Sequence, residues 1–335
     1  MNKTKHIAYF DLLNIAACLA VVWLHCNGIV HTMSGDVTWK FSLIIECIAY
    51  WAVPVFFMLS GATLLSYRER YTTKEFLKKR LYRIVIPFLI WSVLLYLFLV
   101  ISSNKPCSVK EFLISFVNCD IGVYWFFIPL ISIYLTIPVL SLIVSRIDRK
   151  YLWYMVAAEF ILESFIPCLC KLFHLPWFEF LNFPIATGYL IFVLLGYLLA
   201  TQELKSRVRY IAYALAISAL AFRYFYTCFS ADKLLFNYLF FPSVLLAVGV
   251  FIFFRHISQS KMNKINHHLN LSKLASYSFG IYLVHIPVLR ITFHHLNVKN
   301  DNPVWLVCGF ILIYLLSLLT VWIIKKIPLL KYIVP

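Results

Sequence analysis

Long runs of apolar residues, separated by short polar segments, dominate this chain. A helix of about 20 apolar residues spans the hydrocarbon core of a bilayer, and ten runs reach or approach that length. They cover about residues 7–31, 42–67, 84–103, 124–145, 151–171, 184–201, 208–229, 234–254, 275–296 and 303–324. The fifth is the weakest, because two glutamates, a proline and a lysine interrupt it. The pattern predicts an all-α fold, a polytopic membrane helix bundle with about ten transmembrane helices.

The composition and the loops favour one membrane domain. Hydrophobic residues make up 62% of the 335 residues and charged residues only 13%, against about 25% charged residues in an average soluble domain. The sequence contains no low-complexity segment, no linker and no long polar loop. We therefore expect residues 1–335 to form a single transmembrane domain in contact with membrane lipids, with no separate soluble domain.

The basic residues are concentrated on one predicted side of the membrane. The net charge is +16, and 22 of the 30 lysines and arginines fall in alternate polar segments. These segments are residues 1–6, 68–83, 146–150, 205–209, 255–273 and 325–331. Cytoplasmic segments of membrane proteins carry such an excess of basic residues. The distribution predicts that both termini are cytoplasmic, and it accounts for the charge without a nucleic-acid partner.

Polar residues form a stripe on the first apolar segment. Asn14 and His25 are eleven residues apart, which is three helical turns plus roughly 20° at about 100° per residue. Asp11 lies within about 40° of the same line. Ionisable groups inside a membrane are costly, usually face a bundle interior or a water-filled cavity, and are functional by default. We therefore expect this stripe to line a functional site, with His25 as its principal residue.

The cysteine and histidine residues do not form a metal-binding pattern. The nine cysteines have no Cys-x-x-Cys or zinc spacing, and most lie in apolar segments, where cysteine behaves as a small apolar side chain. The histidine pairs at 267–268 and 294–295 lack nearby carboxylate or thiolate partners, so we expect no metal site. Cys107 and Cys119 share a predicted outer loop, where they could form a disulfide or remain free.

The second apolar segment combines a carboxylate with small residues and a proline. Pro54 is expected to kink the helix, and Ser60 with Gly61 allows another helix to approach closely. Glu46 lies near the outer end of this segment, where a carboxylate needs a partner or water. Two interpretations remain open for Glu46: a carboxylate at the level of the lipid headgroups, or a functional group in a substrate pocket.

The third apolar segment follows the densest charge cluster in the chain, with seven lysines and arginines between residues 68 and 83. Arg80 and Arg83 are three residues apart and should be neighbours on one helix face at the cytoplasmic mouth. Guanidinium groups present planar, bidentate donors to phosphate. Arg80 and Arg83, together with Lys79, therefore form a candidate site for an anionic ligand. The alternative is a topology signal that also attracts anionic lipid.

Further polar residues interrupt the later apolar segments. Tyr134 is a candidate polar contact inside a cavity, and Glu159 and Glu163 lie one turn apart on the same helix face. Arg223 and Arg290 could pair with these glutamates, or all four could line an outer substrate pocket. The ninth segment adds a tyrosine and a second buried histidine, for which a structural hydrogen bond is the alternative role. The candidate pocket residues are Glu46, Tyr134, Glu159, Arg223, Tyr282 and His285.

Four groups of residues occur in a fixed order along the chain. They are Asp11-Leu12-Leu13 with position 14 and His25 in the first segment; Phe56-Phe57-x-x-Ser60-Gly61 in the second; Lys79-Arg80-x-x-Arg83 with Pro87-Phe88-Leu89-Ile90-Trp91-Ser92 in the third; and Tyr277-Ser278-Phe279-Gly280-Ile281-Tyr282-Leu283-Val284-His285 in the ninth. Together they resemble the bacterial acyltransferase-3 family of membrane O-acyltransferases, over nearly the whole chain. The family pattern has arginine where this chain has Asn14, and asparagine can form hydrogen bonds but carries no charge.

The resemblance implies a membrane-embedded O-acyltransferase of the bacterial inner, or cytoplasmic, membrane. Members take acetyl or another short acyl group from cytoplasmic acyl-CoA, the donor, and transfer it to a hydroxyl of a cell-surface glycan or a lipid-linked sugar. The basic cluster at residues 79–83 would bind the phosphates of acyl-CoA. Asp11, Asn14 and His25 would form the catalytic group, with His25 as general base or as a transient carrier of the acyl group.

A secondary transporter or flippase for a small or lipid-linked substrate is the main alternative, because it would also show buried histidines, carboxylates and kinked spans. Such transporters typically carry internal repeats, and none is visible in this sequence. A receptor that only binds a ligand in the same pocket is a third class. Transfer of an acyl group from acyl-CoA that depends on His25 would separate the enzyme from both.

Overall fold

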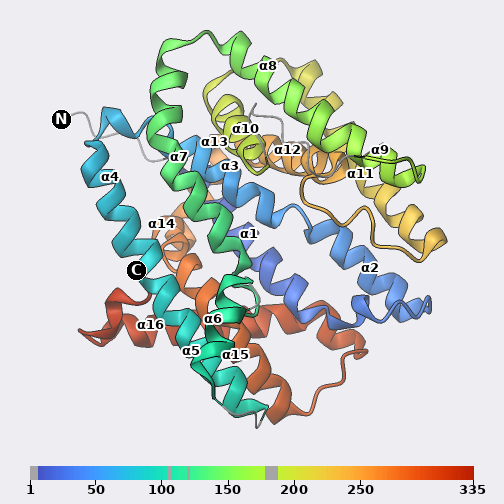
Figure 1. The fold of residues 1–335 in the computed structure, drawn as a ribbon, viewed down its shortest axis with the longest axis vertical. Coiled ribbons are helices and arrows are strands. Elements are labelled where there is room, and N and C mark those ends of the chain that lie inside the picture. The colour runs from blue at the N-terminus through green and yellow to red at the C-terminus, as the bar shows by residue number, and fades with distance from the viewer. Residues whose placement is uncertain (1–6, 104–106, 119–120, 178–187) are drawn as a thin grey trace.

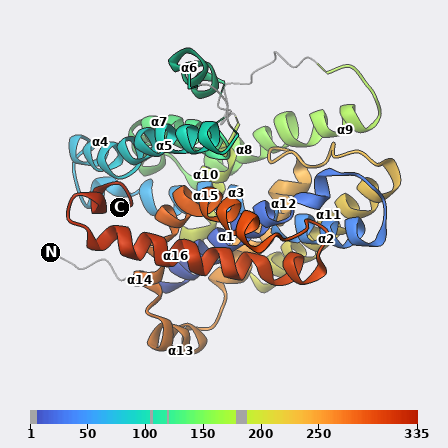
Figure 2. The same cartoon turned by 90° about the horizontal axis from the view of Figure 1, so that it is seen from below.

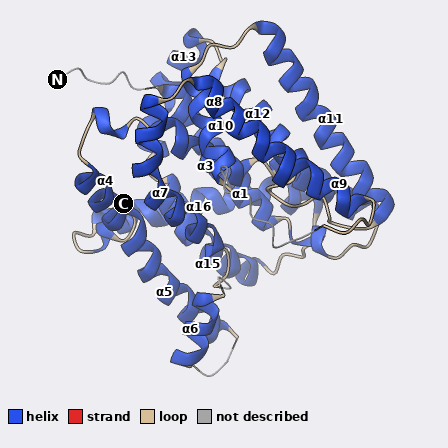
Figure 3. Ribbon diagram, turned by 45° about the horizontal axis from the view of Figure 1, so that its top comes forward, coloured by secondary structure: helices blue, strands red, loops and turns tan. Residues whose placement is uncertain are grey.

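The computed structural model describes residues 7–103, 107–118, 121–177 and 188–335, and every regular element in these ranges is helical (Figure 1, Figure 3). The first half contains α1 (Ala8–Cys26), η1 (Gly28–His31), α2 (Val37–Ala49), α3 (Ala52–Leu64), η2 (Tyr67–Glu69), α4 (Thr73–Arg80), η3 (Leu81–Val85), α5 (Ile86–Ser102), α6 (Val109–Val117), η4 (Tyr124–Phe126), α7 (Phe127–Arg146), α8 (Arg149–Glu159), η5 (Phe160–Phe165) and α9 (Ile166–Leu172). The second half contains α10 (Leu190–Thr201), α11 (Ser206–Ser230), α12 (Phe241–Arg255), α13 (Gln259–Leu269), α14 (Leu271–Ala275), α15 (Ser278–Leu296), η6 (Trp305–Gly309), α16 (Phe310–Lys326) and η7 (Leu330–Tyr332).

Within the described ranges, six helical stretches are long and apolar enough to cross a membrane. They are Ala8–Cys26, Val37–Glu69, Thr73–Ser102, Tyr124–Arg146, Ser206–Ser230 and Trp305–Lys326. The count of ten spans is therefore not confirmed. Each remaining predicted segment contains a helix, but α10 has only 12 residues and α12 only 15. The predicted fifth span is divided into α8, the π-helical η5 and α9.

Helix α1 lies at the centre of the bundle (Figure 1). It contacts α2, α3, α12, α14, α15 and α16, which come from both halves of the chain. Its apolar side chains Leu13 and Ala17 are completely buried, because neighbouring helices cover most of its surface. Two short helices lie away from this core, with α6 and α13 projecting from opposite sides of the bundle (Figure 2).

Glycine residues allow α3 and α10 to touch backbone to backbone. A Cβ atom added at Gly61 would lie 1.9 Å from the carbonyl oxygen of Val193, and one added at Gly196 would lie 1.9 Å from that of Met58. No side chain larger than hydrogen fits at such distances, so each helix presents a glycine to the other. This confirms the close approach predicted at Gly61. The short, buried α10 is held in the bundle through this contact.

The second span is interrupted just before Pro54, where a kink is predicted. Proline has no N–H group with which to bond the carbonyl of the residue four positions earlier, here Tyr50. The helix is interrupted at Tyr50 and Trp51, between α2 and α3. The hydroxyl of Tyr50 donates a hydrogen bond to the carbonyl of Phe236 at 2.6 Å, which fixes the interruption against the loop that follows α11.

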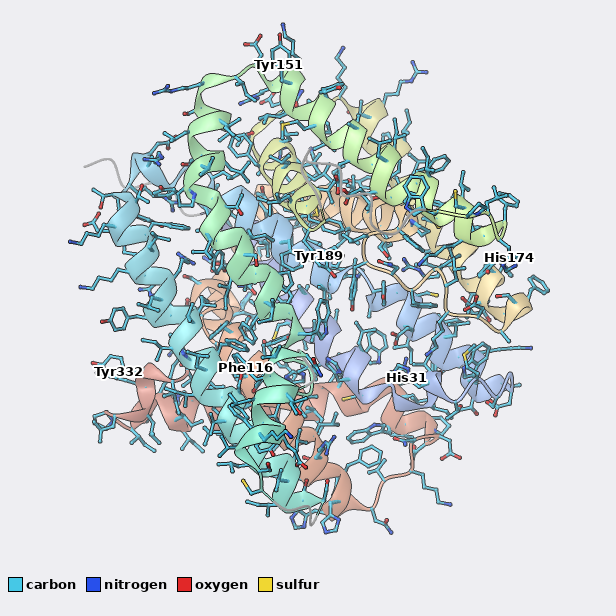
Figure 4. All side chains as sticks on the ribbon, in the orientation of Figure 1. His31, Phe116, Tyr151, His174, Tyr189 and Tyr332 are labelled. Carbon is cyan, nitrogen blue, oxygen red and sulfur yellow. The ribbon has the colours of Figure 1, made fainter. Side chains whose placement is uncertain are left out.

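The basic segments meet at one end of the bundle. Arg149, at the start of α8, donates to the carbonyl of Thr201 at the end of α10, and Arg255, at the end of α12, donates to that of Leu199. We call this region the basic end. It comprises residues 68–83, 146–150, 201–209 and 255–273. Figure 4 shows Tyr151 beside this end and His31 well separated from it.

Candidate functional site

A cavity of about 290 Å³ lies beside the first half of α1, near the basic end. Side chains from α1, α3, α7, α15 and the junction of α4 with η3 line it. We call it the inner cavity. Its polar lining residues are Asp11, Asn14, Ser60, Thr63, Arg80, Tyr134, Ser278 and Tyr282. Leucine and phenylalanine side chains complete the wall, so the space is mostly apolar with a guanidinium at one side.

Arg80 is the strongest anion-binding candidate in the inner cavity. Its guanidinium carbon lies 5.3 Å from the ring centre of Tyr134 and 5.5 Å from that of Phe76. Its Nε atom is buried and has no hydrogen-bond partner among the residues that the structure describes. The two rings therefore hold the guanidinium in place while an N–H group remains available for a ligand. Asn14 lines the same cavity, so the permanent positive charge here comes from α4 rather than from position 14 of α1.

The neighbouring basic residues do not share this position. Arg83 is exposed and is not among the lining residues, so only Arg80 of the predicted arginine pair lines the inner cavity. The reason is η3, a π-helix that begins directly after Arg80. A π-helix has more residues per turn than an α-helix, so it rotates Arg83 away from the face that carries Arg80. Lys79 also points elsewhere and lies over the ring of Tyr71 at 3.8 Å.

A second cavity, of about 710 Å³, lies at the other end of α1, and we call it the outer cavity. Its lining residues are His25, Cys26, Gly28, Leu289, Arg290, Phe293, His294, Asn297, Val298 and Asn300. They come from the end of α1, from α15 and from the loop after α15. At a helix rise of about 1.5 Å per residue, His25 lies about 16 Å along α1 from Asn14. The polar stripe of the first segment is thus divided between two cavities.

His285 and Tyr282 lie between the two cavities. The ring centres of His25 and His285 are 5.1 Å apart, and those of His285 and Tyr282 are 5.6 Å apart. The Nδ1 atom of His285 lies 2.7 Å from the carbonyl oxygen of Tyr282. His285 is fully buried, whereas Tyr282 lines the inner cavity and His25 lines the outer one. Three rings joined by two contacts therefore connect the two spaces.

A proline and two tyrosines fix this part of α15. Pro287 lies inside the helix and cannot donate to the carbonyl of Leu283, four residues earlier. The hydroxyl of Tyr124 donates to that carbonyl at 2.6 Å, and the hydroxyl of Tyr282 donates to the carbonyl of Val123 at 2.7 Å. Tyr124 is 2% exposed, so it is an interior residue and does not belong to an aromatic belt on the protein surface. Sequence reasoning missed it because a tyrosine at a span end resembles a belt residue.

A buried polar cluster lies beyond the end of α1. Asn27, which sequence reasoning also missed, donates to the Oε2 atom of Glu46 at 3.2 Å and to the carbonyl of Ser42 at 2.9 Å. Glu46 is buried inside the protein and lines neither cavity. Arg223 is fully buried and donates to the carbonyl of Leu235 at 3.2 Å and to the hydroxyl of Ser243 at 2.6 Å.

A lysine–histidine contact lies in the loops at the same end. The Nζ atom of Lys233 is 2.9 Å from the Nδ1 atom of His31. Partial burial lowers the pKa of both side chains, and the charge of Lys233 lowers the pKa of His31 further. His31 therefore favours its neutral form, in which Nδ1 can accept a hydrogen bond from the lysine.

The two glutamates of the predicted fifth span do not belong to either cavity. In the part of the chain that the structure describes, neither Arg223 nor Arg290 forms an ion pair with Glu159 or Glu163, so the structure does not support the first of the two alternatives, mutual pairing. Glu163 instead accepts a hydrogen bond from the backbone N–H of Gly188 at 3.1 Å, and Glu159 is buried. Arg223 lies on α11 and Arg290 on α15, whereas Glu163 faces the segment just before α10.

The remaining candidate features concern cysteine and metal chemistry. Cys107 is a free, exposed thiol, whereas Cys119 lies outside the described residues, so the structure does not test their pairing. Among the residues that the structure describes, no group of three or more histidine, cysteine, aspartate or glutamate side chains could hold a metal ion.

The comparison with known proteins gives one match. Residues 7–322 match the model of the acyltransferase-3 family, which is described as an acyltransferase domain. No curated protein and no solved structure matches the chain. All residues that line the inner and outer cavities lie inside the matched range.

Proposed function

Because the chain belongs to the acyltransferase-3 family and is an acyltransferase built from apolar helices, we propose that it transfers an acetyl or other short acyl group from acyl-CoA to a hydroxyl of a cell-surface glycan or lipid-linked glycan precursor. The observation that carries this proposal is the pair of cavities at the two ends of α1. One cavity can receive the donor from one side of a membrane, and the other can receive the acceptor from the opposite side.

The basic end is proposed to face the cytoplasm, where acyl-CoA occurs. The excess of lysine and arginine at this end supports that orientation. The helices α8–α9, α10, α12 and α15 would then complete ten crossings, with both termini in the cytoplasm. In a bacterium this membrane would be the inner, or cytoplasmic, membrane.

The donor is proposed to bind at the basic end with its acyl arm in the inner cavity. The buried Nε–H group of Arg80, which has no partner in the described part of the chain, supports an anionic ligand at the mouth. The exposed Arg83 and Lys79 would contact the nucleotide phosphates outside the cavity. The inner cavity has a volume of about 290 Å³ and a mostly apolar wall, which suit a narrow acyl chain better than a nucleotide. Asn14 can hydrogen-bond an amide of such an arm.

His25 is proposed as the general base. In this step the acceptor oxygen forms a bond to the thioester carbonyl carbon, and His25 takes the proton of the acceptor hydroxyl. The bond between the carbonyl carbon and sulfur then breaks, and the leaving thiolate takes that proton from His25. Neutral histidine suits this role because one of its ring nitrogens has a lone pair that can accept a proton and later return it. A histidine that carries the acyl group covalently is the alternative route within the same site.

The test is transfer of the labelled acetyl group of acetyl-CoA into envelope glycan, in membranes that contain the wild type, His25→Ala or His295→Ala. His295 is an exposed histidine at the end of α15 that lines neither cavity. We expect label in glycan with the wild type, a loss of about 100-fold or more in His25→Ala, and no change in His295→Ala. Full activity of His25→Ala would refute the role of His25.

A second outcome would refute the reaction itself. If the folded wild type transfers no acyl group, with acyl-CoAs of several chain lengths and several envelope sources supplied, the proposal of acyl-CoA-dependent transfer is wrong. Movement of a lipid-linked sugar across vesicles that contain the protein would then favour the transporter or flippase.

A further inference from the structure

The hydrogen bond of His285 fixes which of its ring nitrogens carries a proton. A carbonyl oxygen can only accept a hydrogen bond, so the Nδ1 atom that lies 2.7 Å from the carbonyl of Tyr282 must be the donor. His285 is fully buried, and a buried cation without a partner is costly. The neutral ring therefore has its proton on Nδ1 and a lone pair on Nε2.

The Nε2 atom of His285 is an acceptor without a partner. It is buried and forms no hydrogen bond in the described part of the chain. An unpaired buried acceptor destabilises the folded protein, and an apolar residue at this position would not carry that cost. The neighbouring ring is that of His25, 5.1 Å away between centres and tilted by 43°. A rotation of the His25 ring can bring one of its nitrogens toward Nε2.

The surroundings keep His285 in place while His25 remains adjustable. The carbonyl freed by Pro287 is bound by Tyr124, and Tyr282 is bound to the turn at Val123. His25, in contrast, lies one residue from the end of α1 and lines a cavity. The rigid partner of the pair is therefore His285.

We propose that His285 is a positioning residue for His25: its Nε2 atom accepts a hydrogen bond from one ring nitrogen of His25, which leaves the other ring nitrogen unprotonated and directed to the outer cavity. This inference rests on the proposed role of His25 as the base. A base that is held and oriented by a third group is the general arrangement of catalytic triads. Here the third group is a neutral histidine whose own tautomer is set by a backbone carbonyl.

Two substitutions separate the positioning role from a structural one. In His285→Asn the short amide can still donate to the carbonyl of Tyr282 but does not reach the position of Nε2. In His285→Gln the longer side chain can place an acceptor oxygen there. We expect His285→Asn to lower kcat about 100-fold with little change in KM for acetyl-CoA, and His285→Gln to recover at least about tenfold of that loss. His295→Asn is the matched control and should behave as wild type.

The double variant His25→Ala/His285→Asn gives an independent test. A residue that acts only through His25 has no further effect once His25 is gone, so the double variant should be no less active than His25→Ala alone. A further loss of about tenfold or more would show a separate role and overturn the proposal. Equal activity of His285→Asn and wild type would overturn it as well.

Failure of this inference can be distinguished from failure of the proposed function. If His25→Ala retains activity, the base itself is wrong. If His25→Ala is inactive while His285→Asn is fully active, only the positioning role is wrong. Thermal unfolding in detergent checks that each variant folds. Loss of folding in both His285→Asn and His285→Gln would make His285 a structural residue and would also overturn the inference.

Discussion

Replacing Tyr124 with phenylalanine removes a single hydroxyl from the buried side of α15, and we expect the protein to become less stable. This hydroxyl donates to the carbonyl of Leu283 at 2.6 Å. In an ordinary helix that carbonyl would accept from the amide of residue 287, but Pro287 has none. The phenylalanine ring keeps the packing, so the substitution isolates the loss of the donor.

The size of the effect follows from the burial of the carbonyl. Leu283 is 0% exposed and Tyr124 only 2%, so water cannot replace the missing donor. An unsatisfied buried group costs about 1–3 kcal/mol, whereas hydrogen bonds in membrane proteins average about 0.6 kcal/mol and reach about 1.7. The missing amide of Pro287 excludes the usual helical substitute, which puts this bond at the upper end. We expect Tyr124→Phe to lower the free energy of unfolding by about 1–2 kcal/mol.

The measurement is reversible unfolding of the purified protein in detergent micelles, in which far-UV circular dichroism reports the loss of helix. Tyr96→Phe is the matched control, because the hydroxyl of Tyr96 also donates to a backbone carbonyl, that of Ser108, at 2.9 Å. Ser108 is only partly buried, so water can take over that bond. The control should therefore lose clearly less stability than Tyr124→Phe.

A second background tests the reason for the effect. In Pro287→Ala the amide of residue 287 can bond the carbonyl of Leu283, so the hydroxyl of Tyr124 is no longer needed. Tyr124→Phe should then cost less than about 0.5 kcal/mol in that background. An equal loss in both backgrounds would refute the reasoning, because it would show that the hydroxyl acts through something other than the carbonyl freed by proline.

Three further substitutions test other parts of the molecule. Arg80→Gln should raise KM for acyl-CoA about tenfold or more, because a charge-assisted hydrogen bond contributes about 1.5–3 kcal/mol, while the exposed Arg83→Gln should raise it less; initial rates against donor concentration decide. Gly61→Ala should destabilise the fold by about 2 kcal/mol or more in the same unfolding measurement, since its Cβ would lie 1.9 Å from a backbone oxygen of α10. Asp36 caps α2 by accepting from the backbone N–H of Trp39 at 2.7 Å, which lowers the pKa of Asp36 below its usual 3.8. Its contribution to stability is therefore present above pH 3.8 and is lost as the pH falls through the lowered value. Asp36→Asn, which can still cap the helix, should show a smaller fall in melting temperature between about pH 5 and 2.

The helical period was sufficient to predict the central feature of the site. Asp11, Asn14 and His25 form a stripe because their spacing follows the turn of an α-helix, and α1 is continuous over all three. The close contact at Gly61 and the interruption before Pro54 were predictable for a different reason. Each depends on one residue type whose backbone chemistry has a single consequence.

The features that could not be predicted depend on departures from the regular helix. The spacing of Arg80 and Arg83 predicts a shared face only if the helix is regular, and the π-helix at η3 is not encoded by any single residue type. The predicted fifth span departs from a regular helix in the same way, because the π-helical η5 separates α8 from α9. Tyr124 acquires its role only when Leu283 is adjacent to it in space, 159 residues away in sequence.

The position of His25 shows why the site is a property of the whole chain. Two indole groups fix the end of α1 against the region before α16: Trp23 donates to the carbonyl of Leu306 at 2.8 Å, and Trp305 donates to that of Cys26 at 3.2 Å. These bonds join residues more than 275 positions apart, on either side of His25. The stripe on α1 determines which face carries the histidine, but the last helices determine where that face lies. The proposed contact between His25 and His285 therefore depends on α15 and η6 having docked, so base and partner would come together only in the folded bundle.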